Sequence, residues 1–360
     1  MSRPPRSDQD LDWNMQTDES LLDWSTASSV GRRFAGAGPQ LTPIDRARIV
    51  EDFSELVPEA ETLVSEFTQL HHDGYRARSW VLNRGEWIDQ NIRGFQRGVE
   101  PLAVRALTSH GFQPGNVRRK FMGAQVGTLM GYVSRKVLGQ FDLFLPPDDD
   151  GLIYFVGPNV AEVEQRFAFP KRDFRMWLCL HEVTHRVQFG GVPWLRGYLT
   201  GQIEQYLSQI DLDPKRVLDA LGRAVEEVRE HGARGVDLLP LLMTPEQREI
   251  FERLQGVMSL LEGHASFVMD ELGRQHLQDA DRMKRGLQER RRSSALERNF
   301  QKLIGFDRKV SQYDTGHRFV AYVVQRVGMA GFNRVWEGAR NLPSHAEVLQ
   351  PDSWLARVSP

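Results

Sequence analysis

Two histidines and a glutamate stand close together in the segment DFRMWLCLHEVTHRVQFG at residues 173–190. Its apolar spacing and the Gly-Gly pair that follows predict a buried helix. On a helix, positions four apart share a face, so His181 and His185 can bind one metal ion together. Glu182 projects about 100° away from His181, where a carboxylate can accept a proton from a water held by the metal. This HExxH arrangement is typical of zinc hydrolases; the alternative is two buried histidines satisfied by ordinary hydrogen bonds.

A third protein ligand is expected, because a catalytic zinc site has three protein donors and one open position. The extended form HExxHxxGxxH is absent, since Gln188 and Gly191 stand where its glycine and third histidine would be. A second apolar segment at 256–272 holds Glu262 in its middle, and a carboxylate is seldom buried without a partner or a metal. We therefore expect Glu262 to be the third ligand. His264 is the rival, but it lies about 200° further round the helix and cannot point the same way.

Two further polar residues on this predicted helix are candidates for orienting the ligands. Ser266 and Asp270 lie one and two turns beyond Glu262, on nearly the same face. Either could accept a hydrogen bond from a ligating imidazole, and His264 is a third candidate for such a supporting role.

Helices dominate the rest of the chain, with one β signal. The apolar runs at 141–146 and 152–156, separated by PDDDG, predict a β-hairpin. Pro58 interrupts a helical pattern that opens at Thr42, and so predicts two helices there. A helix is also predicted over 118–139, where glycines recur every four residues and should pack closely against another backbone.

Composition argues against several classes of protein. The 360 residues carry 46 lysines and arginines against 48 aspartates and glutamates, whereas a protein that wraps nucleic acid carries a basic excess. The charged run at 279–299 is therefore expected to be a solvated helix face. The apolar stretch at 121–133 is shorter than the roughly twenty residues that a membrane span needs. With one cysteine, Cys179, we expect a cytoplasmic protein with no nucleic-acid and no membrane partner.

The expected organisation is one folded unit between two irregular ends. Residues 1–40 predict a flexible leader without a secretory signal. Residues 41–340 are expected to form a single, mostly helical domain, and 341–360 an irregular tail punctuated by proline and serine. The sequence leaves the oligomeric state open.

HEVTH followed at a distance by LLEGHA resembles the gluzincin metallopeptidases, whose second helix carries a Glu-Gly-x-Ala ligand motif. More closely, the chain is similar to a bacterial family of zincin-like candidate hydrolases, often labelled deazaflavin-coenzyme-biosynthesis-associated proteins. The match runs from about residue 40 to 340, and its segments occur in the expected order: 123–142, 152–160, 180–189, 258–270 and 312–320.

The resemblance implies a mainly α (α+β) zincin-like fold with a small β-hairpin or sheet beside the active-site helix. It implies one zinc ion per chain on three ligands, with a glutamate as general base: His181, His185 and Glu262, with Glu182 as the base. Many gluzincins have a carboxylate or asparagine four residues after the ligand glutamate, whereas this chain has Ser266 there.

Other residues of the matching segments have candidate roles. Tyr313 is the choice for stabilising an oxyanion, with His317 and Arg318 as alternatives; for each of the three, a purely structural role is the competing interpretation. The strand at 152–156 could be the edge strand along which zincins bind an extended peptide.

Two functions of different class follow. The first is a zinc-dependent hydrolase, a metallopeptidase acting on a peptide or a small amide-containing substrate, in which Glu182 moves a proton. The second is a non-catalytic zincin-fold scaffold or binding protein that keeps zinc for stability or ligand capture. An intact Glu182 favours the first, because structural zinc sites need no base and are usually closed by four protein ligands.

Overall fold

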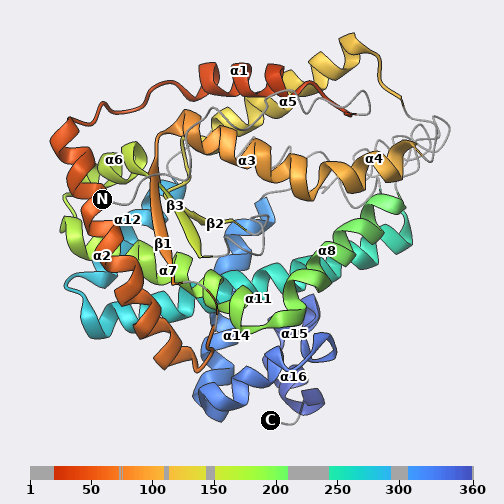
Figure 1. Cartoon of the computed structure of the whole chain (residues 1–360). Coiled ribbons are helices and arrows are strands. Elements are labelled where there is room, and N and C mark those ends of the chain that lie inside the picture. The colour runs from red at the N-terminus through yellow and green to blue at the C-terminus, as the bar shows by residue number, and fades with distance from the viewer. Residues whose placement is uncertain are drawn as a thin grey trace.

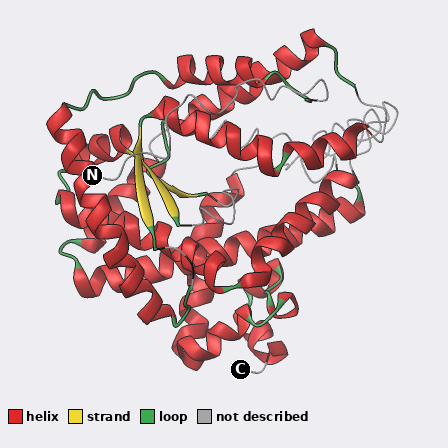
Figure 2. Cartoon of the chain, in the orientation of Figure 1, coloured by secondary structure: helices red, strands yellow, loops and turns green. Residues whose placement is uncertain are grey.

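The computed structural model describes residues 20–72, 74, 76–108, 113–142, 151–209, 243–292 and 307–358. Its helices are α1 (Trp24–Ala35), α2 (Pro43–Thr68), α3 (Arg84–Gly98), α4 (Glu100–Thr108), α5 (Asn116–Ser134), α6 (Gly157–Phe167), α7 (Lys171–Gly191), α8 (Pro193–Ser208), α11 (Pro245–His276), α12 (Ala280–Arg292), α14 (Asp307–Phe332), α15 (His345–Leu349) and α16 (Pro351–Val358). Its strands are β1 (Arg78–Leu82), β2 (Gly139–Phe141) and β3 (Leu152–Val156). The expected mainly α fold is confirmed, with helices surrounding one small sheet in Figure 2.

The three strands form one mixed sheet in the order β1-β3-β2, with β3 parallel to β1 and antiparallel to β2. Of the expected hairpin, the strand at 152–156 is present as β3. The strand expected at 141–146 overlaps β2 only at Phe141, and 143–150 lie outside the described residues. The interpretation of 152–156 as an edge strand is wrong. That segment is β3, which is flanked on both sides and buried along its whole length, so the edges of the sheet are β1 and β2.

The sheet separates two hydrophobic cores. Successive side chains of a strand point to opposite faces, so Ile153 and Phe155 of β3 join one core while Tyr154 joins the other. The larger core is built from the inward faces of α2, α7, α11 and α14, and the smaller one from α1, α3 and the other face of the sheet. Figure 1 shows α7 and α11 below the sheet and α1, α3 and α5 above it. The HExxH helix α7 therefore lies inside the larger core.

α2 is continuous, although Pro58 predicted an interruption. The buried side chains fall on one face both before and after the proline, as Phe53 and Val64 show. A proline inside a helix costs about 3 kcal/mol, and burial of this continuous apolar face outweighs that cost.

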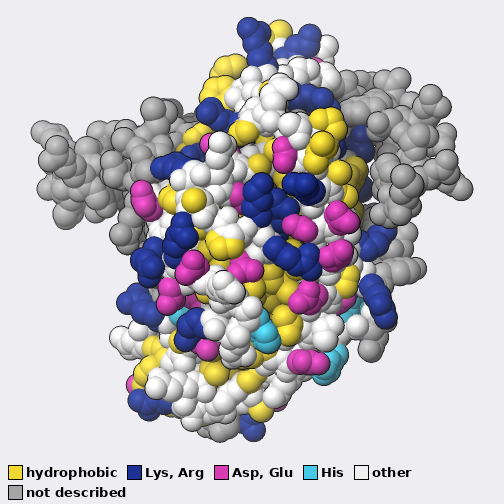
Figure 3. All heavy atoms as spheres, turned by 90° about the vertical axis from the view of Figure 1, so that its left-hand side faces the viewer, with side chains coloured by type: hydrophobic (Ala, Val, Ile, Leu, Met, Phe, Trp, Pro, Cys, Tyr) yellow, Lys and Arg dark blue, Asp and Glu magenta, His cyan; other side chains and the backbone are white. Residues whose placement is uncertain are grey.

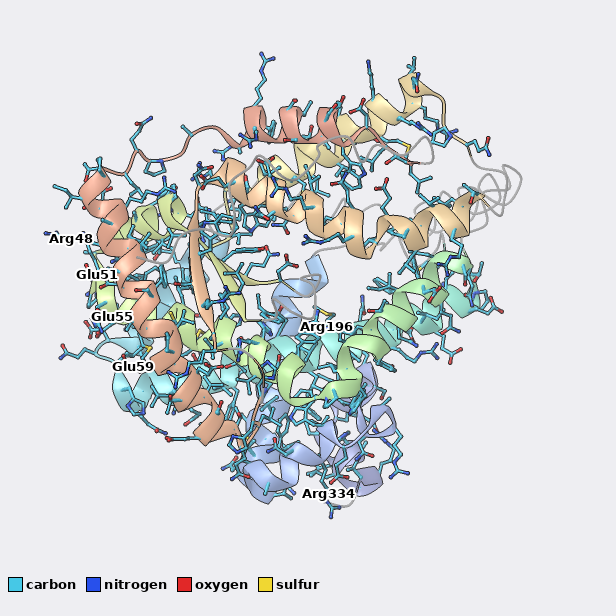
Figure 4. The ribbon with its side chains drawn as sticks, in the orientation of Figure 1. Arg48, Glu51, Glu55, Glu59, Arg196 and Arg334 are labelled. Carbon is cyan, nitrogen blue, oxygen red and sulfur yellow. The ribbon has the colours of Figure 1, made fainter. Side chains whose placement is uncertain are left out.

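The outer face of α2 is charged. Figure 4 shows side chains of this helix directed away from the core: Arg48, Glu51, Glu55 and Glu59. Arg172 of α7 pairs with Glu55 at 2.9 Å. Figure 3 views this side of the molecule and shows lysines and arginines interspersed with aspartates and glutamates. Positive and negative charges are therefore mixed on this face, and neither sign predominates.

The glycine-rich helix α5 packs directly on α1, as Figure 1 shows. A Cβ at Gly127 would lie 2.4 Å from the carbonyl oxygen of Ala27, and one at Gly123 would lie 2.3 Å from that of Asp23. The close approach to another backbone that the glycine spacing predicted is therefore present. Residues 24–35 were expected to belong to a flexible leader, but they form α1 against this glycine face. None of the described helices is long and apolar enough to cross a membrane.

The C-terminal segment is helical, where an irregular tail was expected. Ser344 caps α15 by accepting a hydrogen bond from the Glu347 backbone N–H at 3.2 Å. α16 buries Trp354 completely, and its indole N–H donates to the Asn341 carbonyl at 2.7 Å. A buried tryptophan supplies the tertiary contact that a short helix needs, because its local sequence alone would not sustain it.

We expect Gly127→Ala to destabilise the fold, because the added Cβ would meet the Ala27 backbone rather than a flexible side chain. Overpacking of this kind costs about 1–3 kcal/mol. The matched control is Gly201→Ala in α8, where the added Cβ meets no atom within 4 Å. Alanine has the better helix propensity there and should stabilise by up to about 1 kcal/mol. Chemical denaturation measures both variants, and effects of equal sign would contradict the α1–α5 packing.

Candidate metal centre

His181 and His185 lie one turn apart on α7 and face Glu262 on α11. Their Nε2 atoms are 3.6 and 3.7 Å from Glu262 Oε2. One donor atom from each of the three residues lies within 4.8 Å of the other two. The imidazole rings are perpendicular, with centroids 4.9 Å apart. The structure thus brings together the HExxH histidines and the glutamate that the sequence singled out on the second helix.

Local sequence features of α11 help to place Glu262 opposite the two histidines. The helix begins with a capping box, in which the side chains of Thr244 and Gln247 each accept a hydrogen bond from the other's backbone N–H. Gly263, next to Glu262, lets α14 approach closely, since a Cβ there would lie 2.2 Å from the Gly316 backbone. α11 is therefore packed against α14 on one side while Glu262 faces α7 on another.

The two imidazoles compensate the Glu262 carboxylate. Burial alone would raise its pKa, but the contacts with His181 and His185 outweigh burial and hold the pKa of Glu262 well below its usual value. Burial alone would lower the pKa of His185, yet Glu262 raises it to about 9. In the metal-free chain a proton on His185 therefore balances the charge of Glu262. A divalent cation would take the place of that proton.

The donor set fits zinc. Among the described residues Glu262 Oε2 is buried without a hydrogen-bond partner, and a buried acceptor of this kind is costly unless a cation compensates it. Tetrahedral donors at about 2.0–2.1 Å from zinc lie about 3.3–3.4 Å from one another, close to the separations of Glu262 Oε2 from the two imidazoles. Two histidines and one glutamate are a catalytic zinc set with an open fourth position. In the described ranges, no fourth histidine, cysteine or carboxylate joins the cluster.

Glu182 is buried beside this cluster and is held by the edge strand β2. Its Oε2 accepts a hydrogen bond from the backbone N–H of Phe141 at 3.0 Å. Gly139 provides room for the side chain, since a Cβ there would lie 2.7 Å from Glu182 Cγ. Burial raises the pKa of Glu182, and the charges of His181 and His185 offset only part of that rise. A carboxylate with a raised pKa is suited to taking up and returning a proton.

His264 lies outside the cluster. Its side chain is fully buried, and its ring stacks on Phe332 with centroids 5.2 Å apart. Its Nδ1 lies 2.9 Å from Gln188 Nε2. Burial lowers the pKa of His264 to about 3, so the ring is neutral. Of the two residues weighed as third ligand, Glu262 faces the histidines and His264 contacts a different set of side chains.

The expected hydrogen bonds from the ligating imidazoles to Ser266 or Asp270 are not found among the described residues. Asp270 instead pairs with Lys284, and its Oδ2 lies 3.1 Å from His317 Nε2. Burial would raise the pKa of Asp270, but these two contacts hold it below its usual value. Asp270 is two turns beyond Glu262, about 12 Å along the helix axis, and it serves a separate ion pair.

The three candidates for stabilising an oxyanion all lie on α14. Tyr313 stands near the start of that helix, and its side chain lies outside the described residues. His317 is engaged by Asp270, and the Nη2 atom of Arg318 lies 3.4 Å from Thr315 Oγ1. The role of Tyr313 stays a prediction.

Gln188 contacts a predicted ligand, and the sequence analysis missed this. Its side chain is fully buried, and its Oε1 lies 3.0 Å from His185 Nδ1. Positions three apart on a helix are neighbours, so the spacing after His185 could have indicated the contact. In the longer HExxHxxGxxH motif this position is a glycine, so Gln188 was noted only as a departure from that motif.

Comparison with known proteins assigns the chain to a family. A family model described as zincin-like metallopeptidase matches residues 22–355, so the chain belongs to the zincin-like metallopeptidase family. Among solved structures it is similar to a candidate hydrolase with a novel fold from Chloroflexus aurantiacus. The identity is 30% and the TM-score 0.70, over 94% of this chain and 99% of that chain. No curated protein matches the chain. These matches indicate a hydrolase and do not bear on the deazaflavin label.

We expect one zinc ion per chain and loss of most of it in His181→Ala or His185→Ala, because each change removes one of three donors. Glu262→Gln should also weaken binding, since a neutral amide oxygen is a poorer donor than a carboxylate. His264→Ala should keep the metal. Elemental analysis counts the zinc, and thermal denaturation should show a lower Tm wherever zinc is lost. Zinc retained at the wild-type level in the first three variants would contradict the ligand set.

Gly139→Ala should displace Glu182 without changing the ligands. The added Cβ would lie 2.7 Å from Cγ and 2.9 Å from Oε1 of Glu182, so the carboxylate must move. We expect unchanged zinc content and a fall in kcat of about tenfold or more, as part of the acid–base contribution is lost. Gly197→Ala in α8 is the control, because its added Cβ meets no atom within 4 Å. If Gly139→Ala keeps the wild-type kcat, the close packing of Gly139 against Glu182 does not matter for catalysis.

Proposed function

We propose that the chain is a zinc-dependent hydrolase, a metallopeptidase that cleaves an amide bond in a peptide or a small amide-containing molecule. The observation that carries this proposal is the place of Glu182, which is buried against the three-donor cluster without belonging to it. A zinc site that serves structure alone is usually closed by four protein donors and needs no adjacent base. Membership of the zincin-like family supports the hydrolase class.

The chain's own residues divide the proposed reaction between them. Zinc held by His181, His185 and Glu262 would supply a Lewis acid and lower the pKa of a water molecule. Glu182 takes a proton from the attacking water at Oε1, because its Oε2 is held by the Phe141 N–H. The same oxygen returns the proton to the leaving amine. The hydrogen bond from Phe141 keeps the carboxylate oriented through both transfers.

Among the described residues no strand pairs with the outer edge of β2, which favours an extended substrate there. Val156 N–H donates to Leu138 O at 2.9 Å, so in this antiparallel pair alternate residues of β2 bond to β3. The backbone groups of Gly139 and Phe141 therefore point away from β3, and the bond from Phe141 to Glu182 agrees with this. A peptide segment added at this edge would lie beside the metal ligands. We therefore assign to β2 the substrate-binding role first considered for residues 152–156.

A non-catalytic scaffold that keeps zinc for stability is the competing proposal. It requires either a fourth protein donor or a Glu182 that performs no chemistry. Within the described part of the chain no fourth donor joins the cluster, which favours the hydrolase.

Glu182→Gln separates these two proposals. The carboxylate is not among the three donors, so zinc content should stay near the wild-type level. Loss of the proton acceptor should lower the hydrolytic rate by about 10²–10⁴-fold. A peptide library with mass-spectrometric readout provides the substrates, and wild-type protein stripped of zinc and then reloaded is the control. Cleavage at the wild-type rate in Glu182→Gln would indicate another active site, and a zinc-loaded wild type that cleaves nothing would favour the scaffold.

A further inference from the structure

Gln188 connects the two helices that carry the predicted metal ligands. It is fully buried, three residues after His185 on α7, and its Oε1 lies 3.0 Å from His185 Nδ1. Its Nε2 donates to the backbone carbonyl of Leu261 on α11 at 3.0 Å and lies 2.9 Å from His264 Nδ1. Leu261 directly precedes Glu262. One side chain therefore contacts both a ligand histidine and the backbone beside the ligand glutamate.

The Leu261 carbonyl determines which way the Gln188 amide faces. A carbonyl oxygen only accepts hydrogen bonds, so the NH2 group must face it and the amide oxygen must face His185. The two N–H groups of the amide match the two acceptors, Leu261 O and His264 Nδ1. His185 then donates from Nδ1. Its Nε2, which faces Glu262 Oε2 at 3.7 Å, would offer its lone pair to a metal ion that replaces the second proton of the ring.

We propose that Gln188 is a positioning residue of the metal centre. It selects the His185 tautomer that binds metal through Nε2, and it ties that imidazole to α11 next to Glu262. This inference rests on the proposed function in assuming a metal at the cluster. Metal-ligating histidines commonly donate their other N–H to a carboxylate, a backbone carbonyl or water, and here a neutral side-chain amide accepts it. A neutral acceptor adds no negative charge to a site that already holds two glutamates.

His264 completes the arrangement as an acceptor for Gln188. Its fully buried ring contacts Phe332 and Trp336, with centroids 5.2 and 5.5 Å away. A protonated ring would bury a charge among aromatic side chains and could not accept the Gln188 N–H at Nδ1. The residue that rivalled Glu262 as a ligand thus helps to orient the partner of His185.

The other ligand histidine has no equivalent support in the described part of the chain. His181 Nδ1 is buried there without a hydrogen-bond partner. Gln188 therefore acts on one ligand of the pair, and its loss should weaken metal binding rather than abolish it. Removal of His185 itself should have the larger effect.

The test compares Gln188→Leu with Gln255→Leu. Leucine keeps most of the volume of glutamine and removes the amide. Gln255 is also buried, on α11, and among the described residues it makes no hydrogen bond to a predicted ligand. Zinc affinity, measured by competition with a chromophoric chelator, should fall about 10–100-fold in Gln188→Leu and stay at the wild-type value in Gln255→Leu. Circular dichroism of each variant verifies that it is folded.

A second measurement reports the tautomer itself. In zinc-loaded protein labelled with ¹⁵N-histidine, His185 should show a slowly exchanging Nδ1–H proton in wild type and in Gln255→Leu. In Gln188→Leu this proton should exchange rapidly, because its acceptor is gone. His264→Phe retains an aromatic ring and leaves the Leu261 contact in place, so it should keep the His185 signal.

Unchanged zinc affinity in a folded Gln188→Leu protein would overturn this assignment and leave the hydrolase proposal intact. Coordination of His185 through Nδ1 in wild type would overturn it equally. A folded wild type that binds no zinc would contradict the inference and the proposed function together.

Discussion

The Glu262 carboxylate, whose Oε2 atom is buried between α7 and α11, is the constraint on which the rest of this structure depends. An isolated buried charge is strongly unfavourable, so Glu262 requires partners or a cation. His181 and His185 present their Nε2 atoms at 3.6 and 3.7 Å, longer than ordinary hydrogen bonds and close to the spacing of donors around one metal ion. A divalent cation would compensate the cluster most fully, and its binding would then also stabilise the fold.

The surrounding elements hold this spacing from several directions. The larger core buries α7, and the close approach of Gly263 to Gly316 packs α11 against α14. Gln188 joins the two ligand helices inside the core. On the other side β2 provides a backbone N–H for Glu182 and a glycine that leaves it room. The three donor residues, Glu182 and the outer edge of β2 therefore lie close together.

The sequence was sufficient for the features that local spacing encodes. Helical periodicity placed His181 and His185 on one face, and the apolar surroundings of Glu262 indicated that its carboxylate needs a partner. Features that depend on distant partners could not be predicted in this way. β1 pairs with β3, about seventy residues later, through a five-residue run with no distinctive pattern. Asp270 turns toward Lys284 and His317, which come from two other helices. Trp354 orders a terminal helix whose local sequence suggested a tail.

Anomalous diffraction at the zinc absorption edge, from crystals of the zinc-loaded protein, tests the central claim most directly. The account predicts a single peak per chain, at about 2.0–2.2 Å from His181 Nε2, His185 Nε2 and a carboxylate oxygen of Glu262, with the remaining position open to solvent. A zinc-loaded crystal without a peak between α7 and α11, or one in which His264 replaces Glu262 as the ligand, would contradict it.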